Sequence, residues 1–310
     1  MSEGSRLCED RVVVVTGAGR GLGRAHALEL ARHGARIVVN DAGVDPEGGS
    51  PSREPAERVV AEIRAEGGDA VANGADVSDW EAAKALVRQA IDHFGRLDAV
   101  VNNAGVVRDQ MIVSLEEANL DAVVGVHLKG HFAVTVHASA YWRERAQSEG
   151  PADFRLVNTT SPVGLYGGSG GQSVYAAAKA AIAGLTLTAA NELSRYGVMT
   201  NAIAPAARTR LSEAVRAEAV APPSDPGAFD AMDPANVSPL VAWLCSVESR
   251  GVNGRVFEVE GGRLSLMEGW SRGPSFEGAS RLEPEDLHEI VNRLLSREAV
   301  PRAASQENGD

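Results

Sequence analysis

A tyrosine and a lysine stand four residues apart in the segment Tyr175-Ala-Ala-Ala-Lys179. Residues 174–195 have a helical pattern, and side chains four apart share one face of a helix. A phenol with a pKa of about 10 is a poor base at neutral pH, but a neighbouring ammonium group favours its ionised form. All basic residues except Lys84, Lys129 and Lys179 are arginines, so a lysine at this place is a specific choice. The pair therefore indicates proton transfer to or from a substrate oxygen; the alternative is a surface tyrosine beside a solvated lysine.

A glycine-rich segment follows the first apolar run, and it reads Thr16-Gly17-Ala18-Gly19-Arg20-Gly21-Leu22-Gly23. Such glycines permit a tight turn and let the backbone approach a pyrophosphate, and a helix that begins there offers free N–H groups to the phosphates. The strict GxGxxG pattern is absent, because Leu22 stands where its last glycine would be. The place between a strand and a helix still predicts a dinucleotide-binding turn, with an ordinary turn as the alternative.

The second apolar run ends at Asn40-Asp41, roughly 20 residues beyond the glycines, where Rossmann-type proteins place an acidic residue. A carboxylate there can accept hydrogen bonds from the adenosine ribose and would repel a 2′-phosphate. Asp41 therefore favours NAD over NADP. Arg20 in the glycine turn weakly favours NADP, because its guanidinium group can form an ion pair with a 2′-phosphate. Asp41 could instead cap the loop that follows it.

Short valine-rich runs alternate with longer amphipathic stretches along the chain. Apolar runs without polar alternation are typical of strands buried on both faces of a parallel sheet, and intervening helices imply right-handed crossovers. We predict an α/β protein with a Rossmann-type, doubly wound parallel sheet in a single domain. The expected strands lie near residues 12–15, 37–39, 71, 99–101, 154–157 and 199–203, and the expected helices near 22–33, 58–66, 80–94, 120–140 and 174–195.

Three segments are predicted to be additions to this core. Residues 41–55 and 205–235 are rich in turn-forming residues, and we expect a surface loop and a segment that orders over a ligand. We expect a dinucleotide-binding catalytic domain over 1–268 and a C-terminal extension over 269–310, helical from Pro284 and frayed at its end. Its apolar side chains share one helix face, which we expect to dock onto its own domain or a sister subunit: Leu287, Ile290, Val291, Leu294 and Leu295.

The composition limits the kinds of molecule that the protein can be expected to bind. The chain has 310 residues and a net charge of −12, which disfavours binding to nucleic acid or to an anionic membrane surface. Two cysteines give no disulfide framework, and the first residues lack a signal segment. The longest nearly uncharged apolar stretch, 180–190, is too short to span a bilayer. We therefore expect a soluble cytoplasmic protein with a small-molecule substrate.

Taken together, the motifs resemble those of the short-chain dehydrogenase/reductase family over about residues 10–262. The matching elements are the glycine turn, Asp76-Val77, Asn102-Asn103-Ala104-Gly105, Ser161, Tyr175 with Lys179, and Asn201-Ala-Ile-Ala-Pro205. The resemblance implies that Asp76 and Val77 flank the adenine and that Asn103, Ala104 and Gly105 support the cofactor. It also implies that Pro205 and Thr209 border the nicotinamide and the pyrophosphate. Ala206 departs from the family, which usually has glycine there.

The resemblance also implies roles in catalysis. Tyr175 would exchange the proton with the substrate oxygen, while Lys179 would lower the tyrosine pKa and hold the nicotinamide ribose. Ser161 would orient the substrate oxygen. It lies 14 residues before Tyr175, one more than is common, and the glycine-rich loop 167–171 can absorb the extra residue. Neighbouring Thr160 should point the other way on its strand.

A second departure concerns the fourth catalytic position, where the family has asparagine and this chain has His127. With His131 one turn on, the pair could simply be packed helix histidines. A metal pair would need a third ligand, and no such ligand accompanies it. His127 could preserve a proton relay from Lys179 through water, or it could weaken activity.

Several further stretches resemble the (3R)-hydroxyacyl-CoA dehydrogenase part of peroxisomal multifunctional enzyme type 2 and its bacterial stand-alone relatives. They include Val126-His-Leu-Lys-Gly130 and Ser238-Pro-Leu-Val-Ala-Trp-Leu-Cys245. This implies an acyl-CoA substrate, and three arginines that could meet the CoA or form a solvated helix face are Arg208, Arg210 and Arg216. The alternatives are a steroid or secondary-alcohol dehydrogenase, a 3-oxoacyl carrier-protein reductase, and an NAD-binding protein with weakened catalysis. The family implies a homodimer or homotetramer.

Overall fold

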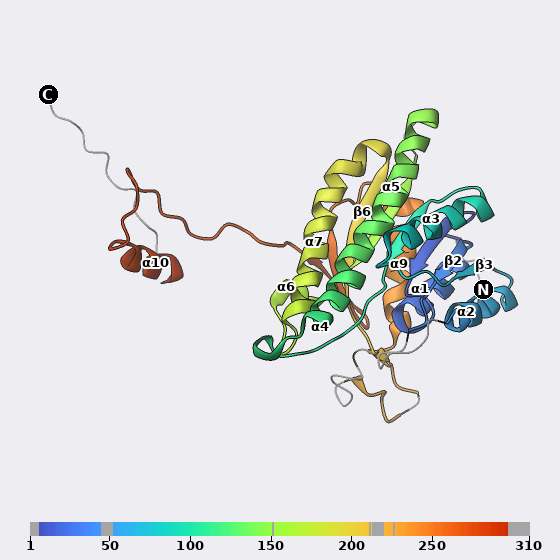
Figure 1. Ribbon diagram of the computed structural model, residues 1–310, viewed down its shortest axis with the longest axis horizontal. Coiled ribbons are helices and arrows are strands. Elements are labelled where there is room, and N and C mark those ends of the chain that lie inside the picture. The colour runs from blue at the N-terminus through green and yellow to red at the C-terminus, as the bar shows by residue number, and fades with distance from the viewer. Residues whose placement is uncertain are drawn as a thin grey trace. The chain divides into compact units, whose positions relative to one another are not determined.

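Eight strands form one sheet in the order β3-β2-β1-β4-β5-β6-β7-β8 (Figure 1). The computed structural model describes residues 6–44, 52–150, 152–210, 212, 220–225 and 227–296. Strands β1 to β7 are parallel, and β8 pairs with β7 in the antiparallel sense. The strands are β1 (Val12–Thr16), β2 (Arg36–Asn40), β3 (Asp69–Asn73), β4 (Ala99–Asn102), β5 (Phe154–Thr159), β6 (Val198–Ala206), β7 (Val256–Glu260) and β8 (Arg263–Met267). The predicted Rossmann-type α/β class is confirmed.

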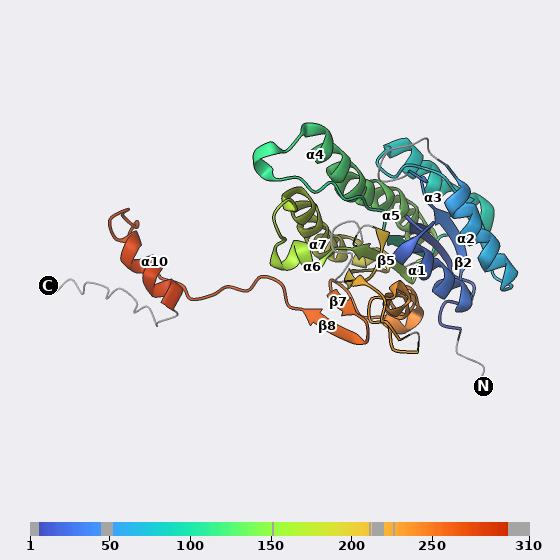
Figure 2. The same cartoon turned by 90° about the horizontal axis from the view of Figure 1, so that it is seen from below.

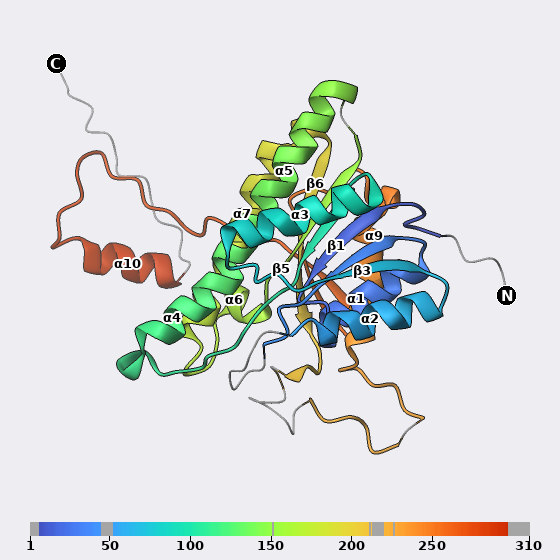
Figure 3. The same cartoon turned by 45° about the vertical axis from the view of Figure 1, so that its right-hand side comes forward.

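Helices cover both faces of the sheet (Figures 2 and 3). Helices α1 (Gly21–Arg32), α2 (Glu54–Ala65) and α9 (Ser238–Cys245) lie on one face, and α3 (Trp80–Phe94), α5 (Gly130–Glu149) and α7 (Ser173–Leu193) lie on the other. Alternate residues of β1 enter the two cores, since Val13 packs in one apolar cluster and Val14 in the other. Burial on both faces explains why the strands are valine-rich throughout.

Local signals explain where the predicted helices begin and end. Helix α3 matches its predicted range because the Asp79 side chain caps it by accepting from the Ala82 N–H, and Gly95 ends it with a φ of 80°. The helix predicted over 120–140 extends further at both ends. It consists of α4 (Glu117–Val123), a π-helical turn η2 (Val124–Lys129) and α5. The remaining short helices are η1 (Ile112–Ser114), α6 (Pro162–Tyr166), η3 (Ser194–Tyr196), η5 (Pro234–Val237) and η6 (Val247–Ser249).

The chain divides into two compact units, Met1–Met267 and Glu268–Asp310. In the second unit, helix α10 (Leu287–Ser296) begins three residues later than predicted, because residues 284–286 form a turn. None of the residues of α10 is buried. The predicted frayed end, at 297–310, and the middle of the predicted 41–55 loop, at 45–51, lie outside the described residues.

Helix α7 with η3, Ser173–Tyr196, is long and apolar enough to cross a membrane by length and composition alone. In this structure it packs against β5 and β6 and contributes Ile182 and Ala189 to the buried core. Its apolar composition is therefore that of a helix packed on a sheet.

Candidate functional site

The three residues predicted to do the proton chemistry lie together where β5 ends and α7 begins. Ser161 is the N-cap of α6, directly after β5, and Tyr175 is in the first turn of α7. The Ser161 hydroxyl is hydrogen-bonded to Tyr175, and the Lys179 Nζ lies 5.7 Å from the centroid of the Tyr175 ring. Thr160 points elsewhere, because its hydroxyl donates to the Lys179 carbonyl at 2.6 Å.

Burial dominates the electrostatics of this trio. Lys179 is only 3% exposed, and its Nζ donates to the Thr159 carbonyl at 2.6 Å. Burial lowers the pKa of Lys179 to about 7. Burial also raises the pKa of Tyr175, while the bond to Ser161 opposes that rise and Asp109 adds to it. These side chains by themselves therefore keep Tyr175 protonated at neutral pH, in the form that can donate a proton.

His127 lies against Tyr175 and is 1% exposed. The centroids of the two rings are 5.3 Å apart in an edge-on arrangement. Its Nε2 is 2.7 Å from the Val106 carbonyl oxygen, and its Nδ1 has no hydrogen-bond partner. A side chain on Gly105 would place its Cβ 2.5 Å from the His127 ring, so only glycine fits there. The turn that carries His127 is π-helical, a geometry that often occurs at functional sites.

His131 lies one turn further on and is equally buried, with its Nε2 also unpartnered. Burial and Lys179 lower the pKa of both histidines, that of His127 to about 3. Both rings are therefore neutral over the physiological range. Within the described ranges, no group of three His, Cys, Asp or Glu side chains could hold a metal ion.

The glycine turn has no room for side chains at Gly17 and Gly23. Gly17 has a φ of 62°, and a Cβ there would lie 2.8 Å from the Ala104 Cα. A Cβ on Gly23 would lie 2.2 Å from the Gly17 carbonyl oxygen. Gly21 opens α1, and the Thr209 side chain lies beside it. This turn, at the N-terminus of a helix, offers the close backbone approach that a pyrophosphate needs.

The predicted Asn103-Ala104 turn is locked to the glycine turn through Thr16, which sequence reasoning did not single out. The Thr16 hydroxyl accepts from the backbone N–H of Asn103 at 2.9 Å and of Ala104 at 3.0 Å. In return, the Asn103 amide donates to the Thr16 carbonyl at 3.0 Å. The one available signal was a hydroxyl at the last position of an otherwise apolar strand.

Asp41 follows β2 directly and uses both carboxylate oxygens. Its Oδ2 accepts from the Gly19 N–H at 2.8 Å, and its Oδ1 accepts from the Gly43 N–H at 2.8 Å. The first bond places the carboxylate at the mouth of the glycine turn, and the second caps the following loop. Asp41 therefore caps the loop that follows it, and its carboxylate also lies beside the glycine turn.

The other predicted cofactor residues lie around the same edge of the sheet. Asp76 accepts from the Ser78 N–H at 2.9 Å, and Val77 is buried next to Gly130. Arg20 is the N-cap of α1, Leu22 is half-buried in its first turn, and Pro205 pairs with Val259 of β7.

Of the arginines considered for CoA binding, Arg208 and Arg210 have interaction partners within the chain. The Arg208 guanidinium forms an ion pair with Asp230 and donates to the Val220 carbonyl at 3.0 Å. It thus ties together the two ends of the 208–230 segment. Arg210 also has an interaction partner, and Arg216 lies outside the described residues.

The strand order, the crowded glycine turn and the adjacent carboxylate fit a dinucleotide and define a Rossmann-type dinucleotide-binding protein. The family described as short chain dehydrogenase matches residues 11–219. The chain belongs to this family, and it is an enzyme that acts on a CH–OH group with a nicotinamide cofactor.

Relatives and solved structures agree with this assignment. Hydroxyacyl-CoA dehydrogenase ChsB1 of Mycobacterium tuberculosis is 46% identical over 83% of this chain and 79% of its own length. The peroxisomal multifunctional enzyme type 2 of Mus musculus is 43% identical over 85% of this chain, which spans only 33% of that protein. The predicted resemblance is thereby confirmed.

Two solved structures have the same fold. A short chain dehydrogenase from Mycobacterium avium is 50% identical, with a TM-score of 0.84 over 97% of this chain and 99% of its own. A short chain dehydrogenase from Burkholderia cenocepacia in complex with NADP is 29% identical, with a TM-score of 0.69 over 83% of this chain and 98% of its own.

Proposed function

We propose that the protein is an NAD-dependent dehydrogenase that interconverts a 3-hydroxyacyl-CoA, steroid-derived acyl chains included, and its 3-oxo form. The observation that carries the proposal is the cluster of Tyr175, Ser161 and Lys179 on the sheet edge that also bears the glycine turn. The substrate class is supported by the name of the 46% identical mycobacterial hydroxyacyl-CoA dehydrogenase.

Each side chain of the cluster has a distinct task in the proposed reaction. A bound nicotinamide ring supplies the hydride acceptor or donor. Tyr175 moves the proton at its phenol oxygen: as the phenolate it takes the proton of the 3-hydroxyl in oxidation, and as the neutral phenol it gives the proton back in reduction. Ser161, hydrogen-bonded to that phenol, orients the substrate oxygen. Lys179 places a positive charge beside the phenol when protonated and would hold the cofactor ribose.

His127 completes the cluster as a neutral hydrogen-bonding group. Its Nε2 lies 2.7 Å from the Val106 carbonyl oxygen and 3.1 Å from the Val106 backbone nitrogen; the shorter contact favours a ring proton on Nε2, which leaves Nδ1 as an acceptor beside the Tyr175 ring. A buried nitrogen without a partner can accept a hydrogen bond from a bound water molecule, and that water would in turn accept a hydrogen bond from the Lys179 ammonium group. We propose that His127 in this way takes the place of the asparagine usual in the family.

The proposed preference for NAD rests on Asp41. Its carboxylate sits at the mouth of the glycine turn, bonded to the Gly19 N–H, where it can meet the ribose hydroxyls and oppose a 2′-phosphate. The Burkholderia structure is in complex with NADP, so the assay of this chain compares the two cofactors directly.

The purified protein is expected to reduce NAD with 3-hydroxyacyl-CoA esters, with a kcat/KM at least about tenfold higher than with NADP. Steady-state assays with both nicotinamides, over acyl-CoA chain lengths and a panel of steroid and secondary alcohols, measure this. Turnover of free alcohols alone would contradict the acyl-CoA assignment. Efficient use of NADPH with carrier-protein thioesters would favour a 3-oxoacyl carrier-protein reductase. Absence of turnover with every substrate, despite cofactor binding, would favour the alternative of an NAD-binding protein with weakened catalysis.

The control for cofactor choice is Asp41→Ala, which removes the carboxylate and its two backbone bonds. It should narrow the preference by raising kcat/KM for NADP relative to NAD. An unchanged ratio would mean that Asp41 serves the local loop alone.

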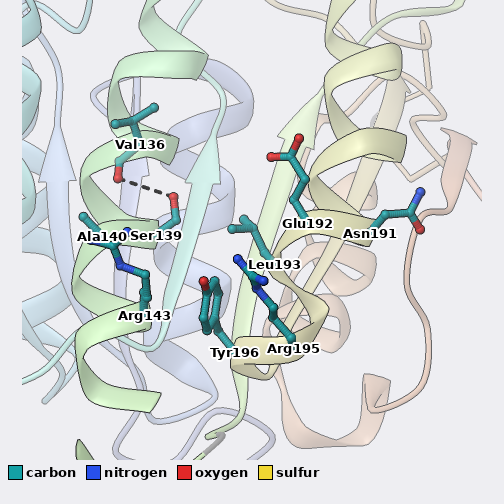
Figure 4. A pocket seen from close by; sticks show the side chains of 9 residues that line it. All are labelled: Val136, Ser139, Ala140, Arg143, Asn191, Glu192, Leu193, Arg195 and Tyr196. Atoms are coloured by element: carbon teal, nitrogen blue, oxygen red, sulfur yellow. Dashed lines mark hydrogen bonds between the residues drawn. The ribbon is translucent and has the colours of Figure 1, made fainter. Parts of the chain in front are cut away.

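We also propose that the enzyme is a homodimer or homotetramer. Phe132, Val136 and Leu187 are 41%, 41% and 49% exposed on α5 and α7. A groove beside them runs between the two helices and is lined by Arg143, Glu192 and Tyr196 (Figure 4). The mass in solution should exceed that of one 32.4 kDa chain, and Val136→Glu should lower it. Sedimentation measures this, and a monomeric wild type would contradict it.

We propose a reducing compartment, the cytoplasm, for this enzyme. Cys8 and Cys245 are both buried and free, and burial raises the pKa of the Cys8 thiol to about 11. Thiols in this state are inert and form no disulfide, as is usual where glutathione is reduced.

A further inference from the structure

Helix α6 carries Ser161 at its N-terminus and lies against α7, the helix that carries Tyr175 and Lys179 (Figure 1). Ser161 is bonded into the first turn of α6, because its Oγ accepts from the Val163 N–H at 3.2 Å and its carbonyl accepts from the Gly164 N–H at 3.0 Å. The place of the Ser161 hydroxyl therefore follows the place of α6.

Gly164 lets the two helices approach closely. A Cβ at this residue would lie 2.6 Å from the Ala180 backbone nitrogen and 2.6 Å from the Lys179 carbonyl carbon. Both distances are too short for a real Cβ, so a side chain would push one helix away. No residue of α6 is buried, whereas Lys179 and Ile182 of α7 are. A side chain at Gly164 would therefore displace α6, and with it Ser161, rather than α7.

Tyr166 fastens the other end of α6 to the sheet. Its hydroxyl donates to the Glu258 Oε2 in β7 at 3.0 Å, and the Met267 Sδ in β8 lies 3.2 Å from the same oxygen. The Glu258 side chain is only 15% exposed and belongs to a strand of the sheet, so the acceptor is fixed. Tyr166 itself is 63% exposed, so its hydroxyl contacts hold this end of α6 more than burial of its ring does.

We propose that Gly164 and Tyr166 are positioning residues for Ser161. The close packing at Gly164 and the bond from Tyr166 to β7 hold α6 in one place, and α6 in turn holds the Ser161 hydroxyl. The inference rests on the proposed role of Ser161 in orienting the substrate oxygen. Each of the two residues acts through the place of that hydroxyl, and a misplacement of about 1 Å at a catalytic group can cost about 10²-fold in rate.

The first test is Gly164→Ala, which adds one methyl group where α6 meets α7. It should lower kcat by about tenfold or more, because α6 must move away. Gly184→Ala is the matched control in α7, since a Cβ there meets no atom within 4 Å, and it should leave kcat unchanged. Steady-state assays measure both variants. A Gly164→Ala enzyme with the wild-type kcat would contradict the proposal.

Tyr166→Phe is a milder variant, which keeps the ring and removes only the hydroxyl, so it decides the question if Gly164→Ala does not fold. It should lower kcat by about threefold or more. Glu258→Ala should lower kcat equally, with no further loss in the double variant. Glu258→Gln keeps an acceptor for the hydroxyl and should retain most of the activity. Additive losses in the double variant would reject the bond between the two side chains as the cause.

Ser161→Ala distinguishes positioning from a general loss of structure. In that background the hydroxyl is absent, so Gly164→Ala and Tyr166→Phe should cause no further fall in the residual kcat. A fall as large as in the wild type would show that the two residues support Lys179 or the fold, and it would overturn the inference. If the wild type turned over other alcohols but no hydroxyacyl-CoA, the proposed substrate would be wrong, and the same comparison with those alcohols would still decide on α6.

Crystal structures of the wild type and of Gly164→Ala give a readout that needs no substrate. In the variant, the Ser161 Oγ should be displaced from its wild-type place while the Lys179 backbone stays. An unmoved Ser161, or a displaced α7, would count against the inference even if kcat fell.

Discussion

Replacement of Tyr175 by phenylalanine is expected to lower kcat/KM by about 10²- to 10⁴-fold, the usual contribution of a positioned acid–base group. The phenol is the proton-transferring group nearest to both Ser161 and Lys179, and no other described side chain in the cluster can take its place. His127 is neutral with a pKa of about 3, and Lys179 points its Nζ at the Thr159 carbonyl. Steady-state oxidation and reduction assays measure the loss.

The variant should remain folded and bind cofactor, because Tyr175→Phe removes one hydroxyl and keeps the ring that packs on His127. Tyr196→Phe, in the groove between α5 and α7, is the matched control and should leave kcat/KM unchanged. Lys179→Arg should also be badly impaired, since a planar guanidinium does not fit a site that is 3% exposed. A phenylalanine variant as fast as the wild type would show that another group transfers the proton.

The parts of the molecule that sequence reasoning predicted are those with local signals. The all-apolar run of β1 indicated a buried parallel strand, and the Asp79 and Gly95 caps delimited α3. The spacing of Tyr175 and Lys179 was informative because helical periodicity alone puts the two side chains on one face. In each case a few consecutive residues contain the physical cause.

The parts it missed depend on contacts between distant residues. Thr16 holds Asn103 across 87 positions, and a hydroxyl at the end of an apolar strand does not indicate which distant residue it meets. The π-helical turn that aims His127 arises within a continuous helical pattern, which spacing does not distinguish from an ordinary helix.

Acidification is expected to destabilise the protein steeply, because the folded chain buries three histidines in their neutral form: His26, His127 and His131. Burial lowers the pKa of His26 from 6.5 to about 3, and that of His127 likewise. Between these values the unfolded chain binds the proton and the folded chain does not. Each histidine therefore removes about 1.4 kcal/mol of stability per pH unit as the pH falls below 6.5, while above 6.5 its contribution is constant.

Together His26 and His127 would remove about 3 kcal/mol per pH unit, and the buried His131 adds to this loss, so two units of acidification remove an amount comparable to the stability of a typical domain. His26 allows one of these contributions to be measured alone, since its Nδ1 lies 2.9 Å from the Ser238 hydroxyl where α1 meets α9, on the opposite face of the sheet from α7, which carries Tyr175. In His26→Gln, the slope of the unfolding free energy against pH between 4 and 6.5 should fall by about 1.4 kcal/mol per unit, as urea titrations measure. The exposed His93→Gln should keep the wild-type slope. An unchanged slope in His26→Gln would mean that His26 becomes protonated within the folded protein, which its fully buried ring makes costly.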